Sequence, residues 1–265
     1  RRSNPSAHAS FIRRKLQECK EQSLTQKQVA AIRYKEGVYL EFSGAADHDL
    51  PIKKFENLPA GIRLLNVKED NGTIKATVYI PAGKESFFID RVQAYADTID
   101  SQETPQNNDL VRSIENVKLA MLDSFWFGAT ETMPKDTAMW CEVWLRFEHN
   151  NWEEAQRDFN TCCTTLDIER KDQRLIFPER LVRLVKANGD QLKDLISTCA
   201  YIAEIRRAPE ATSFFDELTG SEQIEWVDEL LSRTEFHDTN ARICLLDTGI
   251  SAGHPLLSPA IRDKD

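Results

Sequence analysis

The feature that most constrains the fold is an ordered series of strand and helix patterns between residues 139 and 209. Apolar and polar residues alternate, as in a strand, over MWCEVWLRF, and helical spacing follows over NWEEAQRDFNTCCTTL, with Asn150 or Asn151 as the N-cap. Further strand pattern occupies RLIFPERLVRLVKA, a second helix GDQLKDLISTCAYI, and a last strand AYIAEIRRA. This β-α-β-β-α-β order predicts a ferredoxin-like domain, in which two helices cover one face of an antiparallel sheet.

A second strand region precedes this domain. A strand pattern in GVYLEF is followed by two β-rich runs in IRLLNVKEDNGTIKATVYI, which flank Asn71 and Gly72. Asn-Gly is the strongest short hairpin signal, because a type I′ turn needs positive φ at both central residues. Helical spacing follows over GKESFFIDRVQAYADTI. We therefore expect a small α+β module over residues 37–104.

Helical patterns also occur before, between and after these two regions. The basic stretch SFIRRKLQECKEQSLTQKQVAAIRYK predicts one amphipathic helix, solvated or facing a partner, because it lacks the glycines and interleaved aromatics of a nucleic-acid-binding arm. Residues 109–127 repeat apolar positions at i, i+3, i+4 and i+7 and predict a connector helix between the domains. Thr219 and Glu222 have the spacing of a capping box and predict the start of a short acidic helix.

Composition and charge exclude several classes of protein. The chain is 41% apolar and 29% charged, as is typical of soluble globular proteins. No apolar run approaches the ~18 residues of a transmembrane helix, so we expect no membrane partner. The net charge of −9 is unevenly distributed: residues 1–36 hold nine Lys or Arg and three Glu, whereas residues 208–240 hold nine acidic residues and one Arg. With an acidic total and no binding motif, no nucleic-acid partner is expected.

The cysteines indicate a compartment rather than a site. They are Cys19, Cys141, Cys162, Cys163, Cys199 and Cys244. They show neither CxxC nor Cys/His ligand spacing, which favours a reducing, cytoplasmic location over a disulfide framework or a zinc site. We expect no metal and no cofactor. The tryptophans Trp126, Trp140 and Trp144 are either a stacking platform for a ligand or part of the core.

The apolar run ICLL leads directly into Asp247, Thr248 and Gly249. Such a run is typical of a strand buried on both faces in a parallel sheet, and open α/β sheets bind their ligands at the carboxyl ends of these strands. Asp247 is therefore either a catalytic carboxylate or an acid that caps the turn after a strand. Aspartic proteases pair two Asp-Thr-Gly aspartates to activate water, but they usually continue with Ala or Ser, whereas Ile250 follows here.

The longer pattern DTGI-x-x-x-HP-x-L closely resembles the stretch around the triad aspartate of subtilisin-like (S8 family) serine peptidases. The resemblance implies that Asp247 accepts the Nδ1 proton of a catalytic histidine, fixes its tautomer and stabilises the imidazolium. His254 does not match the family's catalytic histidine, which lies in a later His-Gly-Thr-His type motif. That motif and the Gly-Thr-Ser segment of the nucleophile do not occur in residues 1–265, so we expect them further along the chain and this part to be inactive alone.

The resemblance extends upstream of Asp247. Subtilisins are commonly preceded by a βαββαβ propeptide that packs on the catalytic domain, assists its folding and places its tail in the substrate cleft; residues 139–209 are similar in order and position. The wider sequence resembles the N-terminal region of bacterial intracellular subtilases, some of which are encoded beside AAA-type ATPases. The resemblance therefore implies a hydrolase whose partners are its own catalytic remainder, a protein or peptide substrate and, as a candidate, such an ATPase. The alternatives are a non-catalytic module that recruits a partner through residues 37–100, and an aspartic-type protease.

The expected architecture is α+β, with these parts in order: a basic helical arm over 1–36, the α+β module over 37–104, a connector helix over 105–138, a propeptide-like domain over 139–209, an acidic helical linker over 210–240, and the first strand of an α/β catalytic domain over 241–265.

Overall fold

The chain forms two compact units, Arg1–Ala208 and Pro209–Asp265. The computed structural model describes residues 4–29, 35–46, 48–99, 104–208, 218–237 and 253–261. Over these residues the chain is α+β, with two four-stranded antiparallel sheets, both in the first unit. Every helix in the described ranges is too short or too polar to span a lipid bilayer.

The first sheet has the strand order β2-β3-β1-β4, and neighbouring strands are antiparallel. Its strands are β1 (Val38–Gly44), β2 (Arg63–Asp70), β3 (Thr73–Ile80) and β4 (Ile114–Leu119). The hairpin predicted between β2 and β3 is confirmed: Asp70 pairs with Thr73, and the two turn residues have φ of 50° at Asn71 and 71° at Gly72. Positive φ at both positions is the requirement of the type I′ turn.

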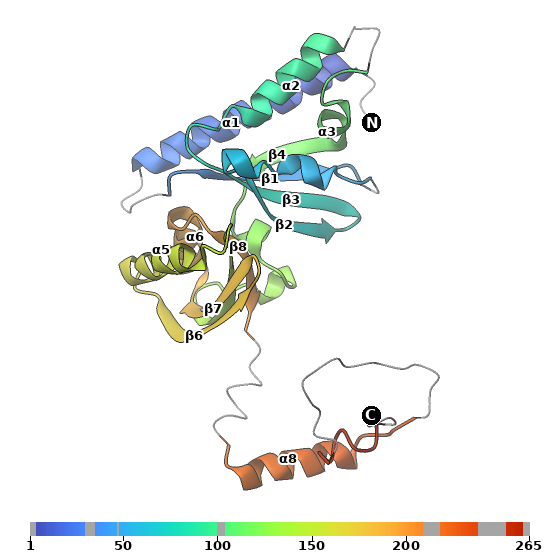
Figure 1. The fold of residues 1–265 in the computed structure, drawn as a ribbon, viewed down its shortest axis with the longest axis vertical. Coiled ribbons are helices and arrows are strands. Elements are labelled where there is room, and N and C mark those ends of the chain that lie inside the picture. The colour runs from blue at the N-terminus through green and yellow to red at the C-terminus, as the bar shows by residue number, and fades with distance from the viewer. Residues whose placement is uncertain are drawn as a thin grey trace. The chain divides into compact units, whose positions relative to one another are not determined.

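Helices α1 (Pro5–Val29) and α2 (Phe87–Thr98) lie side by side on one face of this sheet (Figure 1). The short helix α3 (Asn108–Ser113) precedes β4. The prediction that the N-terminal helix is a solvated or partner-facing arm is wrong for one side of α1. Ile12, Leu16 and Cys19 recur at helical spacing and are buried against α2 and the sheet, because this apolar stripe completes the core.

The prediction of a continuous connector helix is also wrong. Its residues form α3, then the strand β4, and then one helical turn, α4 (Leu122–Phe125). Strand β4 pairs with β1, with Val117 opposite Phe42, and so completes the first sheet at its edge. Ile114 and Val117, which belong to the apolar pattern that suggested a helix, are buried in the core under the helices.

Phe42 lies at the centre of the first core, and its replacement by alanine is expected to lower the free energy of unfolding by about 3–5 kcal/mol. The ring is fully buried and lies 4.9 Å from the Phe55 ring and 4.8 Å from the Phe88 ring, centroid to centroid, so truncation leaves a cavity. Urea unfolding followed by circular dichroism measures the change. The control is Phe87→Ala, because Phe87 is only partly buried. A loss at Phe42 no larger than the loss at Phe87 contradicts this assignment of the core.

The second sheet has the order β6-β7-β5-β8, again with antiparallel neighbours. Its elements follow one another as β5 (Met139–Arg146), α5 (Trp152–Thr165), β6 (Glu169–Phe177), β7 (Arg180–Ala187), α6 (Gly189–Thr198) and β8 (Ile202–Arg207). This is the β-α-β-β-α-β succession that the sequence predicts. Asn151, one of the two predicted N-caps, occupies the cap position of α5.

The two sheets share one strand order. In each sheet the first strand in the chain lies between the third and the fourth. The connections differ: α5 joins β5 to β6, whereas the described residues between β1 and β2 form only the 3-10 helices Ile52–Phe55 and Leu58–Ala60. Helix α1 precedes β1 and packs against α2, so the first sheet also carries two long helices on one face (Figure 1).

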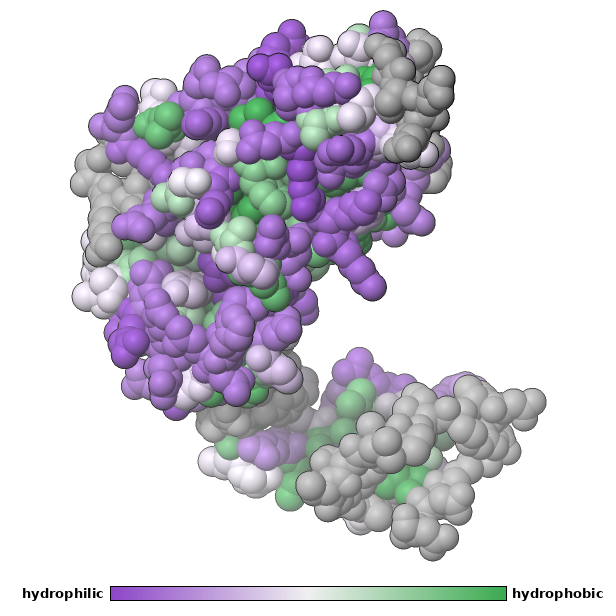
Figure 2. Space-filling model, turned by 45° about the horizontal axis from the view of Figure 1, so that its top comes forward, coloured by the Kyte–Doolittle hydropathy of each residue, from purple (hydrophilic) through white to green (hydrophobic). Residues whose placement is uncertain are grey.

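In the second unit the described helix is α8 (Gly220–Ser232), and the predicted capping box is confirmed. The Thr219 hydroxyl accepts from the backbone N–H of Glu222, and the Glu222 carboxylate accepts from the backbone N–H of Thr219 at 2.7 Å. Hydrophobic side chains remain on the surface of this unit, as Figure 2 shows. They include Ile224 and Leu230 of α8.

Candidate functional site

Asp247, the predicted triad aspartate, lies outside the described residues, and so does the strand predicted before it. Downstream of the motif the structure describes residues 253–261, which form consecutive turns. There the His254 Nδ1 accepts a hydrogen bond from the backbone N–H of Leu256 at 3.2 Å, and its carbonyl accepts from Leu257 and Ser258. His254 therefore shapes a local turn, in keeping with its lack of a match to a catalytic histidine.

The described part of the chain offers a candidate interaction surface on the second sheet. We call it the helix-free face, the side of the sheet opposite α5 and α6. Alternation along β5 defines it: Cys141, Val143 and Leu145 are buried in the core with the helices, whereas Trp140 and Trp144 point the other way and are only partly buried. Cross-strand partners share a face, so the register assigns the remaining members.

One row of the helix-free face crosses the whole sheet. Trp144 of β5 lies opposite Val182 of β7 and Glu204 of β8, and Val182 lies opposite Leu175 of β6. Phe177, two residues beyond Leu175, stacks on the Trp144 ring with centroids 5.8 Å apart and planes 5° from parallel. The row therefore brings aromatic and aliphatic side chains from three strands together.

Two apolar side chains of this row, both on β6, are unusually exposed, whereas Val182 is buried. Leu175 is 62% exposed and Phe177 46% exposed. Isolated exposed apolar residues need no explanation, but contiguous groups of them mark interaction surfaces. The intervening residue, Ile176, is 46% exposed on the opposite side of β6, where it pairs with the buried Leu181. Ile176 is therefore a matched control for substitutions at Leu175, because it is a neighbouring exposed residue on the other face of the sheet.

Charged groups border the apolar row. The Arg206 guanidinium lies over the Trp144 ring, 4.6 Å from its centroid, and donates to the Glu204 carboxylate at 2.6 Å. The Trp144 indole N–H donates to the Glu142 carboxylate at 3.1 Å. An apolar centre with a polar, charged rim is the usual composition of a protein–protein interface.

The corresponding face of the first sheet is covered by the second half of the unit. Tyr39, Leu65 and Tyr79 are buried there in one core with Trp126 and the second sheet. The Tyr39 hydroxyl donates to the Cys199 carbonyl at 2.8 Å and accepts from the Ile202 N–H at 3.2 Å. Burial raises the pKa of Tyr39 well above its usual value, so this hydroxyl keeps its proton and acts as a donor. In the first sheet, the side without helices therefore packs against the second half of the same unit.

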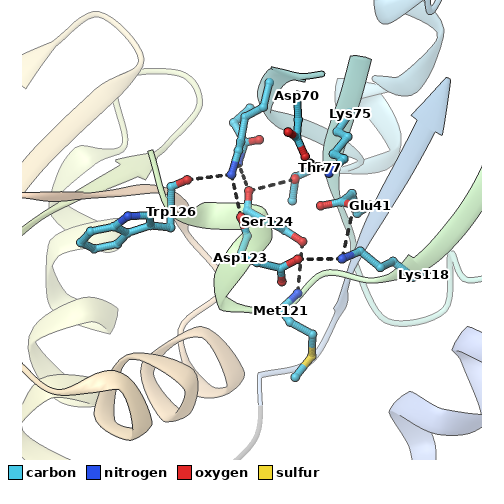
Figure 3. Close-up of polar contacts among 11 residues, drawn as sticks. Glu41, Asp70, Lys75, Thr77, Lys118, Met121, Asp123, Ser124 and Trp126 are labelled. Carbon is cyan, nitrogen blue, oxygen red and sulfur yellow. Dashed lines mark hydrogen bonds and ion pairs between the residues drawn. The ribbon is translucent and has the colours of Figure 1, made fainter. Parts of the chain in front are cut away.

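A charged cluster lies beside this junction (Figure 3). The Lys118 ammonium is 2.8 Å from the Asp123 carboxylate and 3.4 Å from the nearly buried Glu41 carboxylate. Burial lowers the pKa of Lys118, but the hydrogen bond with Asp123 and the charge of Glu41 outweigh it, so the pKa is raised. Lys68 donates to the carbonyls of Asp123 and Trp126 at 2.6 and 2.7 Å. Lys118 is ion-paired with Asp123 and Glu41, and Lys68 is hydrogen-bonded to backbone carbonyls, so the cluster fastens α4 to the first sheet rather than forming an acid–base site.

The three tryptophans of the sequence prediction, Trp126, Trp140 and Trp144, lie in two different environments. Trp126 is buried in the core, and its indole N–H donates to the Ala129 carbonyl. Trp140 and Trp144 lie on the helix-free face, where Trp140 carries the Lys171 ammonium 4.9 Å from its ring centroid. Leu175 and Phe177 stand in the continuous apolar run Leu175–Phe177, which has no apolar–polar alternation, so the sequence alone does not assign them to one face.

One group of metal-ligating side chains occurs in the part of the chain that the structure describes. Asp158 and Cys162 of α5 and Cys199 at the end of α6 have their ligand atoms within 4.8 Å of one another.

Comparison with known proteins gives no match, neither to a family model nor to a curated protein.

Proposed function

We propose that this chain is the N-terminal regulatory part of a subtilisin-like serine endopeptidase. In this proposal residues 139–209 assist the folding of the catalytic domain and restrain it, and Asp247 is the triad aspartate. The observation that supports it best is the exposed apolar helix-free face on a domain of β-α-β-β-α-β order that precedes the Asp-Thr-Gly-Ile motif. The ferredoxin-like likeness belongs to the same proposal, supported by the antiparallel strand order β6-β7-β5-β8.

The proposed chemistry divides the triad along the chain. Hydrolysis through an acyl-enzyme needs a nucleophile within hydrogen-bond reach of a base, and a third group that orients the base. Asp247 is that third group, because a carboxylate that accepts the Nδ1 proton holds the histidine in the tautomer whose Nε2 can take a proton. The proposal requires the histidine and the serine to lie outside residues 1–265.

The helix-free face is the proposed contact with that catalytic remainder. Burial of apolar surface contributes roughly 25 cal/mol per Å², so covering Leu175, Phe177 and Trp144 favours association. Strand β8 is an edge strand of this sheet, and the chain reaches the unit boundary after Ala208 directly beyond it. In the proposal, β8 therefore directs the tail of the domain towards the substrate cleft. An AAA-type ATPase is included as a further partner on the sequence resemblance alone.

Leu175→Asp is the variant that tests this contact. The substitution places a charge where the proposal buries an apolar side chain, so binding of residues 1–265 to the separately produced downstream polypeptide is expected to weaken about tenfold to a hundredfold. Isothermal titration calorimetry measures the dissociation constant, and inhibition of peptide hydrolysis by the complete catalytic domain gives a second readout.

Ile176→Asp is the matched control, because Ile176 neighbours Leu175 on β6, is also exposed and lies on the opposite face. Its binding is expected to stay within about twofold of the unsubstituted chain. Equal weakening by both variants, with both folded by circular dichroism, refutes the helix-free face as the contact. Absence of any binding by the unsubstituted chain refutes the propeptide-like role.

A further inference from the structure

Two thiols and one carboxylate converge where helices α5 and α6 approach each other. Asp158 and Cys162 are four residues apart on α5, so they project from one side of that helix. Cys199 is the residue that ends α6. One carboxylate oxygen and the two sulfurs lie within 4.8 Å of one another, and both cysteines are buried.

Asp158 is the unexplained member of this group. Its Oδ2 is buried, and among the described residues it has no hydrogen-bond partner. Asp158 also forms no ion pair with a side chain in the described ranges. A buried carboxylate oxygen without a partner is costly, and such groups are normally paired or coordinate a metal.

We propose that Asp158, Cys162 and Cys199 bind one zinc ion that joins α5 to α6. Thiolate and carboxylate ligands suit zinc, and three protein ligands leave a fourth position for water. Tetrahedral zinc, with bonds of about 2.3 Å to sulfur and about 2.0–2.2 Å to oxygen, places its ligand atoms roughly 3.5–4 Å apart. Ligand atoms within 4.8 Å of one another therefore need to approach by about 1.3 Å or less to close the site. Each thiol releases its proton to solvent as its sulfur–zinc bond forms, and no electron is transferred.

The backbone around Cys199 is already held in place for such a site. Its N–H donates to the Leu195 carbonyl within α6, and its carbonyl accepts from the Tyr39 hydroxyl, which is itself fixed by the Ile202 N–H. Supporting contacts of this kind orient metal ligands and limit their movement. The proposed ion joins α5 to α6 beside the existing hydrogen bond from Tyr39 of β1 to Cys199, and it does not depend on the peptidase proposal.

Cobalt is the probe that tests this site, because Co²⁺ occupies zinc sites and shows a thiolate-to-cobalt charge-transfer band. The whole chain of residues 1–265, reduced and freed of metal by a chelator, is titrated with Co²⁺ and then with Zn²⁺. We expect one equivalent of Co²⁺ to give the band and one equivalent of Zn²⁺ to remove it. Zinc is also expected to raise the midpoint of thermal unfolding, because it binds only the folded chain.

Variants assign the ligands. Cys162→Ser and Cys199→Ser are expected to lose the band, and Asp158→Asn to weaken Co²⁺ binding at least about tenfold. Asp158→Asn is also the variant that decides the outcome if a serine variant fails to fold, because it preserves size. The matched control is Cys163→Ser, since Cys163 is the adjacent buried thiol of α5 and lies beside Arg170 and Arg183 instead. Cys244→Ser is the second control, and both controls are expected to keep the band.

The proposal is overturned if the unsubstituted chain shows no thiolate-to-cobalt band. It is also overturned if folded Asp158→Asn binds Co²⁺ as tightly as the unsubstituted chain, or if the band disappears in folded Cys163→Ser or Cys244→Ser.

Discussion

Replacement of Asp247 by asparagine is expected to lower peptide hydrolysis by the complete protein about 10⁴-fold while leaving its fold intact. Asparagine is similar in size to aspartate, but its amide cannot stabilise the imidazolium and allows the histidine to adopt the wrong tautomer. Steady-state hydrolysis of an unstructured protein substrate measures the loss, and thermal unfolding establishes that the variant is folded.

The control for this prediction is His254→Gln, because His254 shares the motif but serves a local turn through its Nδ1. Its turnover is expected to stay within about an order of magnitude of the unsubstituted protein. Unchanged hydrolysis in Asp247→Asn would remove Asp247 from the mechanism, and with it the subtilisin-like proposal.

Residues 1–265 alone are expected to hydrolyse no peptide substrate, although the same residues are expected to bind the downstream polypeptide. In the proposed mechanism they supply only the orienting carboxylate of the triad, and an orienting carboxylate by itself does not attack a peptide bond. Cleavage of a fluorogenic unstructured protein is measured for residues 1–265, for the downstream polypeptide and for their mixture.

Two outcomes would favour the alternative functions. Activity in residues 1–265 alone that is lost in Asp247→Asn and unaffected by serine-directed inhibitors would support the aspartic-type alternative. A reading frame without His-Gly-Thr-His and Gly-Thr-Ser motifs downstream would support the binding module, whose partner would have to use surfaces other than the covered face of the first sheet.

Several elements could be predicted from the sequence because their signals are local. Asn71 and Gly72 define a hairpin through their own backbone preferences, and Thr219 with Glu222 defines a helix start through hydrogen bonds within one turn. The order of elements in residues 139–209 was readable for the same reason, since strand and helix periods differ over a few residues. Asp247 is recognisable by its motif alone, and its role stays a proposal.

Other features were decided only by the tertiary structure. Strand β4 has apolar spacing compatible with a helix, and it is a strand because it pairs with β1, about 75 residues earlier in the chain. Helix α1 is part of a core because α2 and the sheet cover its apolar stripe. Cys199 approaches Asp158 and Cys162 only after the second sheet has brought α6 beside α5, so no spacing rule along the chain could indicate their meeting. Local preferences act within a few residues, whereas pairing, burial and ligand sets depend on which distant segments the fold brings together.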